Sequence, residues 1–83
     1  MPSAYILLNS KPDSELGIIS KVKDVIKTCD QSAMYEIQGV YGVYDIVVKV
    51  ECSKMGDVSE ILRRIRRVEK VISTITMLVI EEQ

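Results

Sequence analysis

The hydrophobic residues of this chain follow two different periods, and the changes between the periods predict six elements. Residues 4–9 form a short apolar run rich in strand formers, and residues 10–13 end the run with turn chemistry. A helix capped by Asp13 or Ser14 should follow. Its apolar residues fall on one arc of a helical wheel: Ile18, Ile19, Val22, Val25, Ile26 and Cys29.

The second half of the chain repeats the alternation of periods. Residues 33–38 and 43–51 read as two strands joined by a tight turn near Gly42, which predicts a hairpin. A second helix is predicted by apolar residues with the spacing of one helical face: Val58, Ile61, Leu62, Ile65 and Val68. Residues 71–80 are β-branched and apolar on both alternating faces, which is typical of a central or doubly covered strand, and residues 81–83 form a polar tail.

The order βαββαβ predicts an α+β, ferredoxin-like fold, in which an antiparallel four-stranded sheet has both helices on one face. We expect one domain over residues 1–83. Simple alternation places two apolar sets on opposite sides of the last strand: Val71, Ile75, Met77 and Val79 on one, and Ile72, Leu78 and Ile80 on the other. A domain of this size buries only about 60% of its unfolded surface, so we expect it to dimerise through the helix-free face.

Composition removes several function classes. Eleven basic and 12 acidic residues give a net charge of −1, which supplies no general attraction for nucleic acid or for a membrane surface. There is no signal sequence and no apolar run of about 18 residues, so a cytoplasmic location is expected. The chain has no histidine, and Cys29 and Cys52 lack metal-ligand spacing. We therefore expect reduced thiols, no metal, no cofactor and no enzymatic activity.

The residue least expected in its place is Asp45, which interrupts the apolar run of the third predicted strand. Aspartate is depleted in strands and is seldom buried without a partner. It could lie at a strand edge near a turn, or it could anchor a ligand. The glycine turn at Gly42, three residues earlier, favours pursuing the ligand.

Residues 42–47 (GVYDIV) and 71–76 (VISTIT) resemble the ligand-binding domain of the Lrp/AsnC regulators, also called the RAM domain. The resemblance extends from Ala4 to Ile80. The family's full-length members carry an N-terminal helix-turn-helix, whereas here the first strand begins within five residues of Met1. The chain therefore resembles a stand-alone form of the sensing domain.

The resemblance implies a small effector, typically an amino acid, bound between dimers of an octamer-like ring. It also implies full-length Lrp/AsnC regulators as possible partners, and it assigns the ligand contacts to Tyr41, Gly42, Asp45, Thr74 and Thr76. The chemistry is consistent with this, because a glycine turn exposes N–H groups to a carboxylate and Asp45 can accept from an ammonium group. Tyr41 departs from the small hydroxyl residue that the family often has there. The structural alternatives are a hairpin glycine and threonines that are simply strand formers.

Two other functions stay open at this point. A small ferredoxin-like dimeric enzyme would need Asp45 and a tyrosine as acid and base, and a purely structural oligomerisation module would need no ligand. Four arginines in residues 63–67 could suggest nucleic-acid binding. On a helix they fan over the solvent side, and Glu60 lies one turn away from Arg63 and Arg64, so a partly paired, solvated face is expected.

Overall fold

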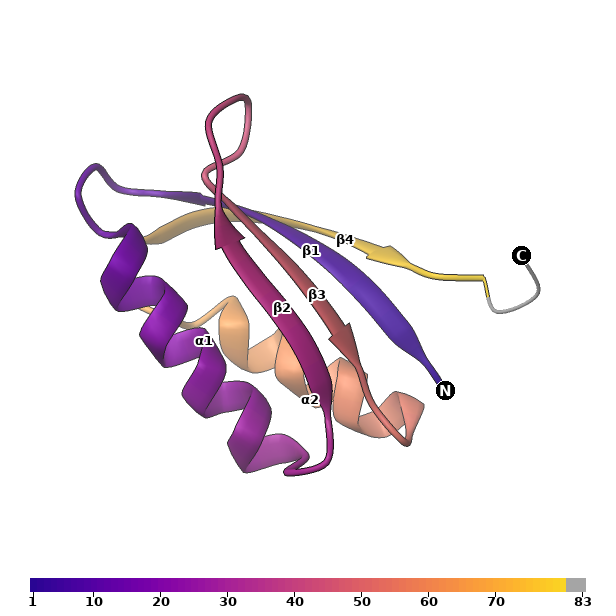
Figure 1. Cartoon of the computed structure of the whole chain (residues 1–83). Coiled ribbons are helices and arrows are strands. Elements are labelled where there is room, and N and C mark those ends of the chain that lie inside the picture. Colours follow the sequence, from indigo (N-terminus) through magenta and orange to yellow (C-terminus); the bar gives the residue numbers. More distant parts are fainter. Residues whose placement is uncertain (81–83) are drawn as a thin grey trace.

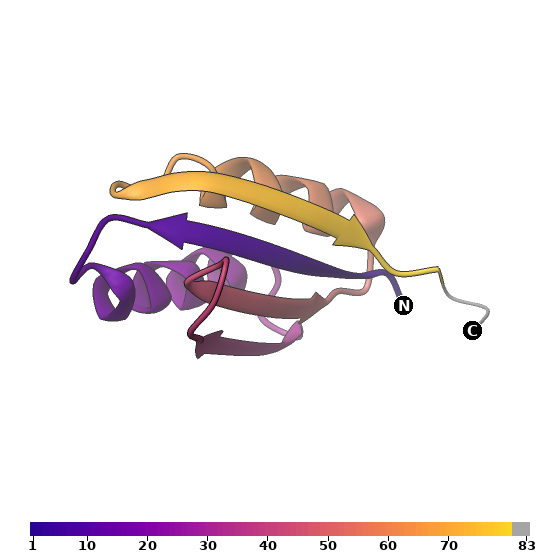
Figure 2. The same ribbon diagram turned by 90° about the horizontal axis from the view of Figure 1, so that it is seen from above.

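The computed structural model describes residues 1–80, and its elements follow the predicted order (Figure 1). They are β1 (Ser3–Ser10), α1 (Glu15–Cys29), β2 (Met34–Gly39), β3 (Ile46–Glu51), α2 (Met55–Ile65) and β4 (Val71–Leu78). The strands form one antiparallel sheet in the order β2-β3-β1-β4. Both helices cover the same face, as Figures 1 and 2 show. The predicted ferredoxin-like fold is confirmed. The prediction of a central or doubly covered last strand is wrong, because β4 lies at an edge of the sheet and Ile72, Ile75 and Leu78 are exposed.

The core lies between the helices and one face of the sheet. Because strand side chains alternate, every second residue of β1 and β3 points toward the helices. These residues are buried together with one stripe from each helix: Ala4, Ile6, Leu8, Ile46, Val48, Val50, Ile18, Val22, Ile26, Val58, Ile61 and Ile65. The two helical stripes are the predicted ones, and the helix-periodic positions flanking them are partly buried against this core.

The connection between β2 and β3 differs from the predicted tight turn. It is a six-residue loop, Val40 to Asp45, and β3 begins at Ile46 instead of at residue 43. The backbone N–H of Val40 donates to the carbonyl of Asp45 at 2.8 Å and closes the loop at its base. Asp45 is thus the last residue of a loop and does not interrupt a strand. Figure 1 shows the loop projecting beyond the end of the sheet.

A bulge between β1 and β4 overturns part of the predicted facing of the last strand. Asn9 lies opposite Ser73, but the next residue, Ser10, lies opposite Val71, so that Ile72 is an extra residue. Ser10 is on the helix side, and Val71 accordingly packs against the core. The prediction that Val71 shares a face with Ile75 and Met77 is therefore wrong.

The face of the sheet without helices is largely apolar near β1 and β4 and charged toward β2. Its apolar residues are exposed or half-buried: Tyr5, Leu7, Val47, Ile75 and Met77. On the charged side, the Lys49 ammonium lies 5.7 Å from the centre of the Tyr5 ring, a cation–π distance. Neither helix in the described part of the chain is long and apolar enough to span a bilayer.

Candidate functional site

Three connections meet at one end of the sheet: β1 to α1, β2 to β3, and α2 to β4 (Figure 1). The up-and-down order of the elements places all three there. Backbone hydrogen bonds join them, because the N–H of Lys11 donates to the carbonyl of Lys70 at 3.0 Å and the N–H of Asp45 donates to that of Leu8 at 2.9 Å. Segments far apart in the sequence thus form one continuous surface.

Asp45 fastens the β2–β3 loop to the end of β1. Its Oδ2 accepts a hydrogen bond from the backbone N–H of Ser10 at 2.8 Å in a partly buried setting. The backbone of Asp45 is also hydrogen-bonded: its N–H donates to the carbonyl of Leu8, and its carbonyl accepts from the N–H of Val40. Charge-assisted hydrogen bonds to a backbone N–H are among the stronger ones. Asp45 therefore has a structural role, which the sequence left open beside the ligand role.

Gly42 occupies the tip of the same loop with a φ of +146°, a conformation that side-chain-bearing residues rarely adopt. No atom lies within 4 Å of the position a Cβ would take, so the glycine is required by the backbone conformation and not by lack of space. Tyr41 and Val43, on either side of it, are almost fully exposed. The loop offers an apolar tip next to the carboxylate of Asp45.

Beside the loop lies an open depression of about 580 Å³. Gly39, Val40, Tyr41 and Asp45 line it from the loop, and Asp13 and Glu15 line it from the start of α1. The sequence did not identify Asp13 and Glu15 as site residues. The only signal for them was two acidic residues at the end of a predicted turn. Three carboxylates around one depression favour a ligand with a cationic group.

Thr74 and Thr76 lie elsewhere. Both are on β4, where they lie opposite Leu8 and Ile6 of β1, and their side chains point toward the helices. β1 lies between them and β3. Two strand spacings, about 9.5 Å, therefore separate the backbone of β4 from the backbone of β3. The Thr76 hydroxyl is buried without a hydrogen-bond partner among the described residues. One subunit thus places Tyr41 and Asp45 on the depression. Gly42 lies in the same loop but not in the lining, and the two threonines lie apart from all three.

A second depression, about 680 Å³ in volume, lies between α1 and β2. Its lining is a mixture of neutral, acidic and basic groups: Asp24, Lys27, Thr28, Gln31 and Tyr35. It is larger than the depression at the β2–β3 loop, but no set of like charges converges on it. Volume alone does not identify a binding site, and we favour the loop depression.

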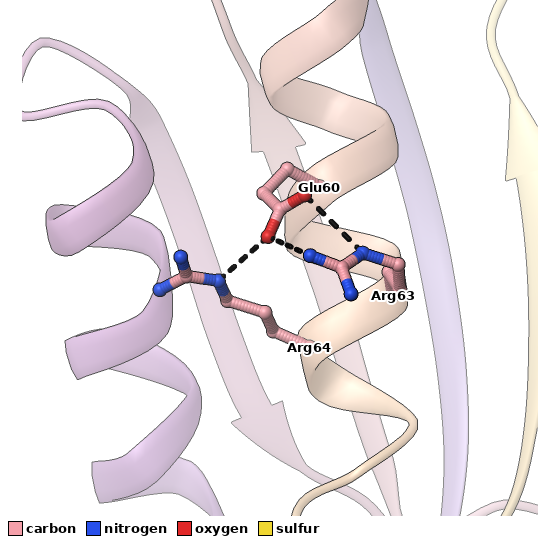
Figure 3. A network of polar contacts seen from close by, with 3 residues as sticks. All are labelled: Glu60, Arg63 and Arg64. Carbon is pink, nitrogen blue, oxygen red and sulfur yellow. Dashed lines mark hydrogen bonds and ion pairs between the residues drawn. The ribbon is translucent and has the colours of Figure 1, made fainter.

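The arginines of α2 form the local ion pairs that the spacing predicted (Figure 3). Glu60 accepts from Nε of Arg64 at 2.8 Å and from Nε and Nη2 of Arg63 at 3.2 and 2.5 Å. Hydrogen bonds from Arg64 and then Arg63 lower the pKa of Glu60. All three groups are at the solvent surface, where such pairs contribute little to stability.

The cysteines supply no nucleophile. Both are free; Cys52 is buried, and Cys29 is half-buried at the end of α1. Burial raises the pKa of Cys52 to about 11 and also raises that of Cys29. Both therefore remain thiols at neutral pH. Within residues 1–80 no group of His, Cys, Asp and Glu side chains is arranged to hold a metal ion.

The sequence matches the Lrp/AsnC ligand binding domain over residues 4–83. The chain belongs to this family. This match confirms the resemblance seen in the sequence. Lrp/AsnC ligand-binding domains are regulatory modules, so the general function of this chain is that of an effector-binding domain. No curated protein sequence shows significant similarity to the chain.

Solved structures support the same assignment. FFRP-DM1 is 30% identical with a TM-score of 0.77, and the match covers 96% of this chain and 100% of that one. The hypothetical protein PHS023 from Pyrococcus horikoshii is also 30% identical, with a TM-score of 0.78 and coverage of 99% and 93%. E. coli AsnC shares the fold at 19% identity and a TM-score of 0.75, and this Lrp/AsnC domain spans 52% of its length.

Proposed function

We propose that this Lrp/AsnC domain binds a small effector with an ammonium group, typically an amino acid, in the depression beside the β2–β3 loop. The observation that carries the proposal is the convergence of Asp45, Asp13 and Glu15 on that depression, which Val40 and Tyr41 of the same loop also line. The carboxylates would accept from the ammonium group, and the loop N–H groups near Gly42 would donate to a carboxylate. Tyr41 would cover the apolar part of the ligand.

We assign the predicted contact of Thr74 to a neighbouring subunit, and we propose no ligand contact for the Thr76 hydroxyl, which is buried within its own subunit. In one subunit these residues lie on the far side of β1 from the loop, so they cannot contact a ligand held by the same subunit's Asp45. A site shared between subunits would combine the β2–β3 loop of one subunit with Thr74 of the other. The apolar helix-free face, with Tyr5, Leu7 and Ile75, supports dimerisation through that face. Dimers would then associate into a ring.

Calorimetric titration of the assembled protein with the standard amino acids tests the proposal. Each ligand found should be paired with its N-acetyl derivative, which lacks the ammonium group, and with its amide, which lacks the carboxylate. We expect the N-acetyl form to lose most of the affinity. Asp24→Asn removes a carboxylate from the exposed side of α1 and is the matched control for Asp45→Asn. No binding at millimolar ligand by an intact assembly would contradict the proposal and favour a purely structural module.

Subunit exchange with full-length Lrp/AsnC regulators is a separate part of the proposal. Its basis is the common fold, which this chain shares with about half of the length of E. coli AsnC. Native mass spectrometry after co-expression with a full-length regulator should show mixed assemblies. Homogeneous assemblies alone, after co-expression and after refolding of a mixture, would contradict this part and leave effector binding unaffected.

A further inference from the structure

The depression beside the β2–β3 loop carries an unbalanced negative charge. Its lining contains three carboxylates and no lysine or arginine: Asp13, Glu15, Gly39, Val40, Tyr41 and Asp45. Within residues 1–80, lysine and arginine side chains form ion pairs only with Glu60, so none of these three carboxylates has a cationic partner there. Glu15 and Asp45 are half-buried, where charges are screened less than at the open surface. The depression therefore favours a ligand that brings more positive than negative charge.

A single ammonium group would compensate only part of this charge. The hydrogen bond from Ser10 occupies Oδ2 of Asp45, which leaves Oδ1 for an ammonium group of the ligand. Asp13 and Glu15 belong to a different element, the start of α1, and line the same depression. A neutral amino acid held at Asp45 would leave these two carboxylates without a compensating charge and close to its own carboxylate. Such like-charge proximity is unfavourable, so a neutral amino acid matches this lining poorly.

We propose that the effector carries two cationic groups, as a basic amino acid does, and that Asp13 and Glu15 bind the second one. This inference rests on the proposed function, because it concerns the same depression. That the domain binds an effector at all is independent of these charges and follows from the family match. In this arrangement Asp45 accepts from the α-ammonium group, and the two carboxylates at the start of α1 accept from the side-chain cation.

The loop side of the depression suits the hydrocarbon stem between two such groups. Val40 and Tyr41 line this side, and both are exposed. The methylene groups of a basic side chain pack against apolar surface while its charged end stays at a polar site. An aromatic ring also attracts a cation over its face. A basic side chain therefore matches both the apolar loop and the acidic start of α1, whereas a purely apolar side chain matches only the loop.

L-Lysine and L-norleucine test for the second cation, because both have an unbranched side chain and only that of lysine ends in an ammonium group. Calorimetry with the assembled wild-type protein should show that lysine binds about ten- to a hundredfold more tightly than norleucine. This preference should decrease as salt is added, because salt screens the carboxylates. Cadaverine, which is lysine without its carboxylate, distinguishes a basic amino acid from a diamine as the source of the two cations.

Substitutions test whether the start of α1 binds the second cation. Asp13 has a φ of +63°, which asparagine also tolerates, so Asp13→Asn combined with Glu15→Gln removes two charges with little change in shape. We expect this double variant to bind lysine and norleucine with nearly equal affinity. Asp45→Asn should instead weaken both ligands and retain the preference for lysine. Asp24→Asn, which changes the lining of the other depression, is the control and should keep the wild-type preference.

Lysine that binds the wild type no more tightly than norleucine would overturn the second cation. An unchanged preference in the folded double variant would overturn the assignment to Asp13 and Glu15. If the double variant fails to fold, the comparison of the two ligands with the wild type decides. Failure of the proposed function has a different result, because none of the standard amino acids would then bind, whereas norleucine binding without a preference for lysine contradicts only the present inference.

Discussion

The carboxylate of Asp45 accepts a hydrogen bond from the backbone N–H of Ser10 at 2.8 Å, across 35 residues of sequence. This contact fixes the position of the β2–β3 loop relative to β1. It also occupies Oδ2 of Asp45, the residue that we propose contacts the ligand. Substitution can separate this structural role of Asp45 from its proposed role in ligand binding.

Asp45→Ala should leave the partly buried N–H of Ser10 without an acceptor and lower the free energy of unfolding by about 1–3 kcal/mol. Asp45→Asn retains an oxygen acceptor and removes only the charge, so its stability should stay near that of the wild type. Effector affinity should nevertheless fall by roughly ten- to a hundredfold in Asp45→Asn. Thermal melts without ligand and calorimetry on the same samples measure both. Normal affinity in Asp45→Asn would mean that the carboxylate has only its structural role.

Thr76→Val should stabilise the domain. The Thr76 hydroxyl is buried without a hydrogen-bond partner in the subunit, and a buried unpaired hydroxyl is costly. Replacement by the nearly isosteric valine should raise the free energy of unfolding by about 1 kcal/mol. Thr74→Val, one repeat earlier on the same face of β4, is the matched control and should change stability less. A lower melting temperature for Thr76→Val would show that the hydroxyl is satisfied, by water or by another subunit.

Lys70→Gly should also stabilise the domain. Lys70 has a φ of +74°, in the left-handed region that is unfavourable for residues with a Cβ. Its carbonyl accepts from Lys11, so the conformation is held in place by the neighbouring connection. Glycine should relieve strain of about 1 kcal/mol, whereas Lys70→Ala retains it. Urea unfolding of both variants measures the difference, and equal midpoints would contradict the prediction.

Acid should weaken the contact between the end of α1 and the β3–α2 connection. Asp30 accepts from the hydroxyl and N–H of Ser32 and from the N–H of Ser53, and these bonds lower its pKa below the ordinary 3.8. A lowered folded-state pKa contributes stability that is present above the unfolded-state value and is lost as pH falls through the folded-state value. Melts from about pH 6 to about pH 2 should therefore show a smaller acid dependence for Asp30→Asn than for the wild type. Asp24→Asn is the control, and an equal loss in both variants would exclude this role.

Cys52 should be unreactive in the folded protein. Its pKa of about 11 leaves almost no thiolate at pH 8, and its side chain is buried. A disulfide reagent such as DTNB should label it only after guanidinium is added. Fast labelling of Cys52 under native conditions, identified by peptide mapping against Cys29, would show that β3 opens locally near its end.

The sequence determined the elements whose pattern is local. The buried stripes of α1 and α2 were readable because each apolar residue recurs at helical spacing, and the four strands followed from their apolar runs. The predicted tight turn of the hairpin is wrong, because Val43 and Tyr44 are good strand formers that here belong to a loop. Their environment, a projecting loop tied down by Asp45, depends on β1 and is invisible in the local pattern.

Long-range features could not be predicted for the same reason. The bulge at Ser10 exists only in the pairing of β1 with β4, more than 60 residues away, and it alone turns Val71 to the core. Asp13 and Glu15 become neighbours of Asp45 only when the start of α1 meets the β2–β3 loop. Of the predicted site, Tyr41, Gly42 and Asp45 lie in one loop, whereas the distance to Thr74 depends on strand order.

The hydrogen bond between Val79 and Ser3 places the first and last described strands side by side at the end of the sheet opposite the three connections. A short linker could join the chain there, and new termini could be opened at the tip of the β2–β3 loop without crossing the core. Such a circular permutant would keep every strand neighbour while cutting the glycine turn. Comparing its folding with its ligand affinity would separate the scaffold from the loop proposed to bind the effector.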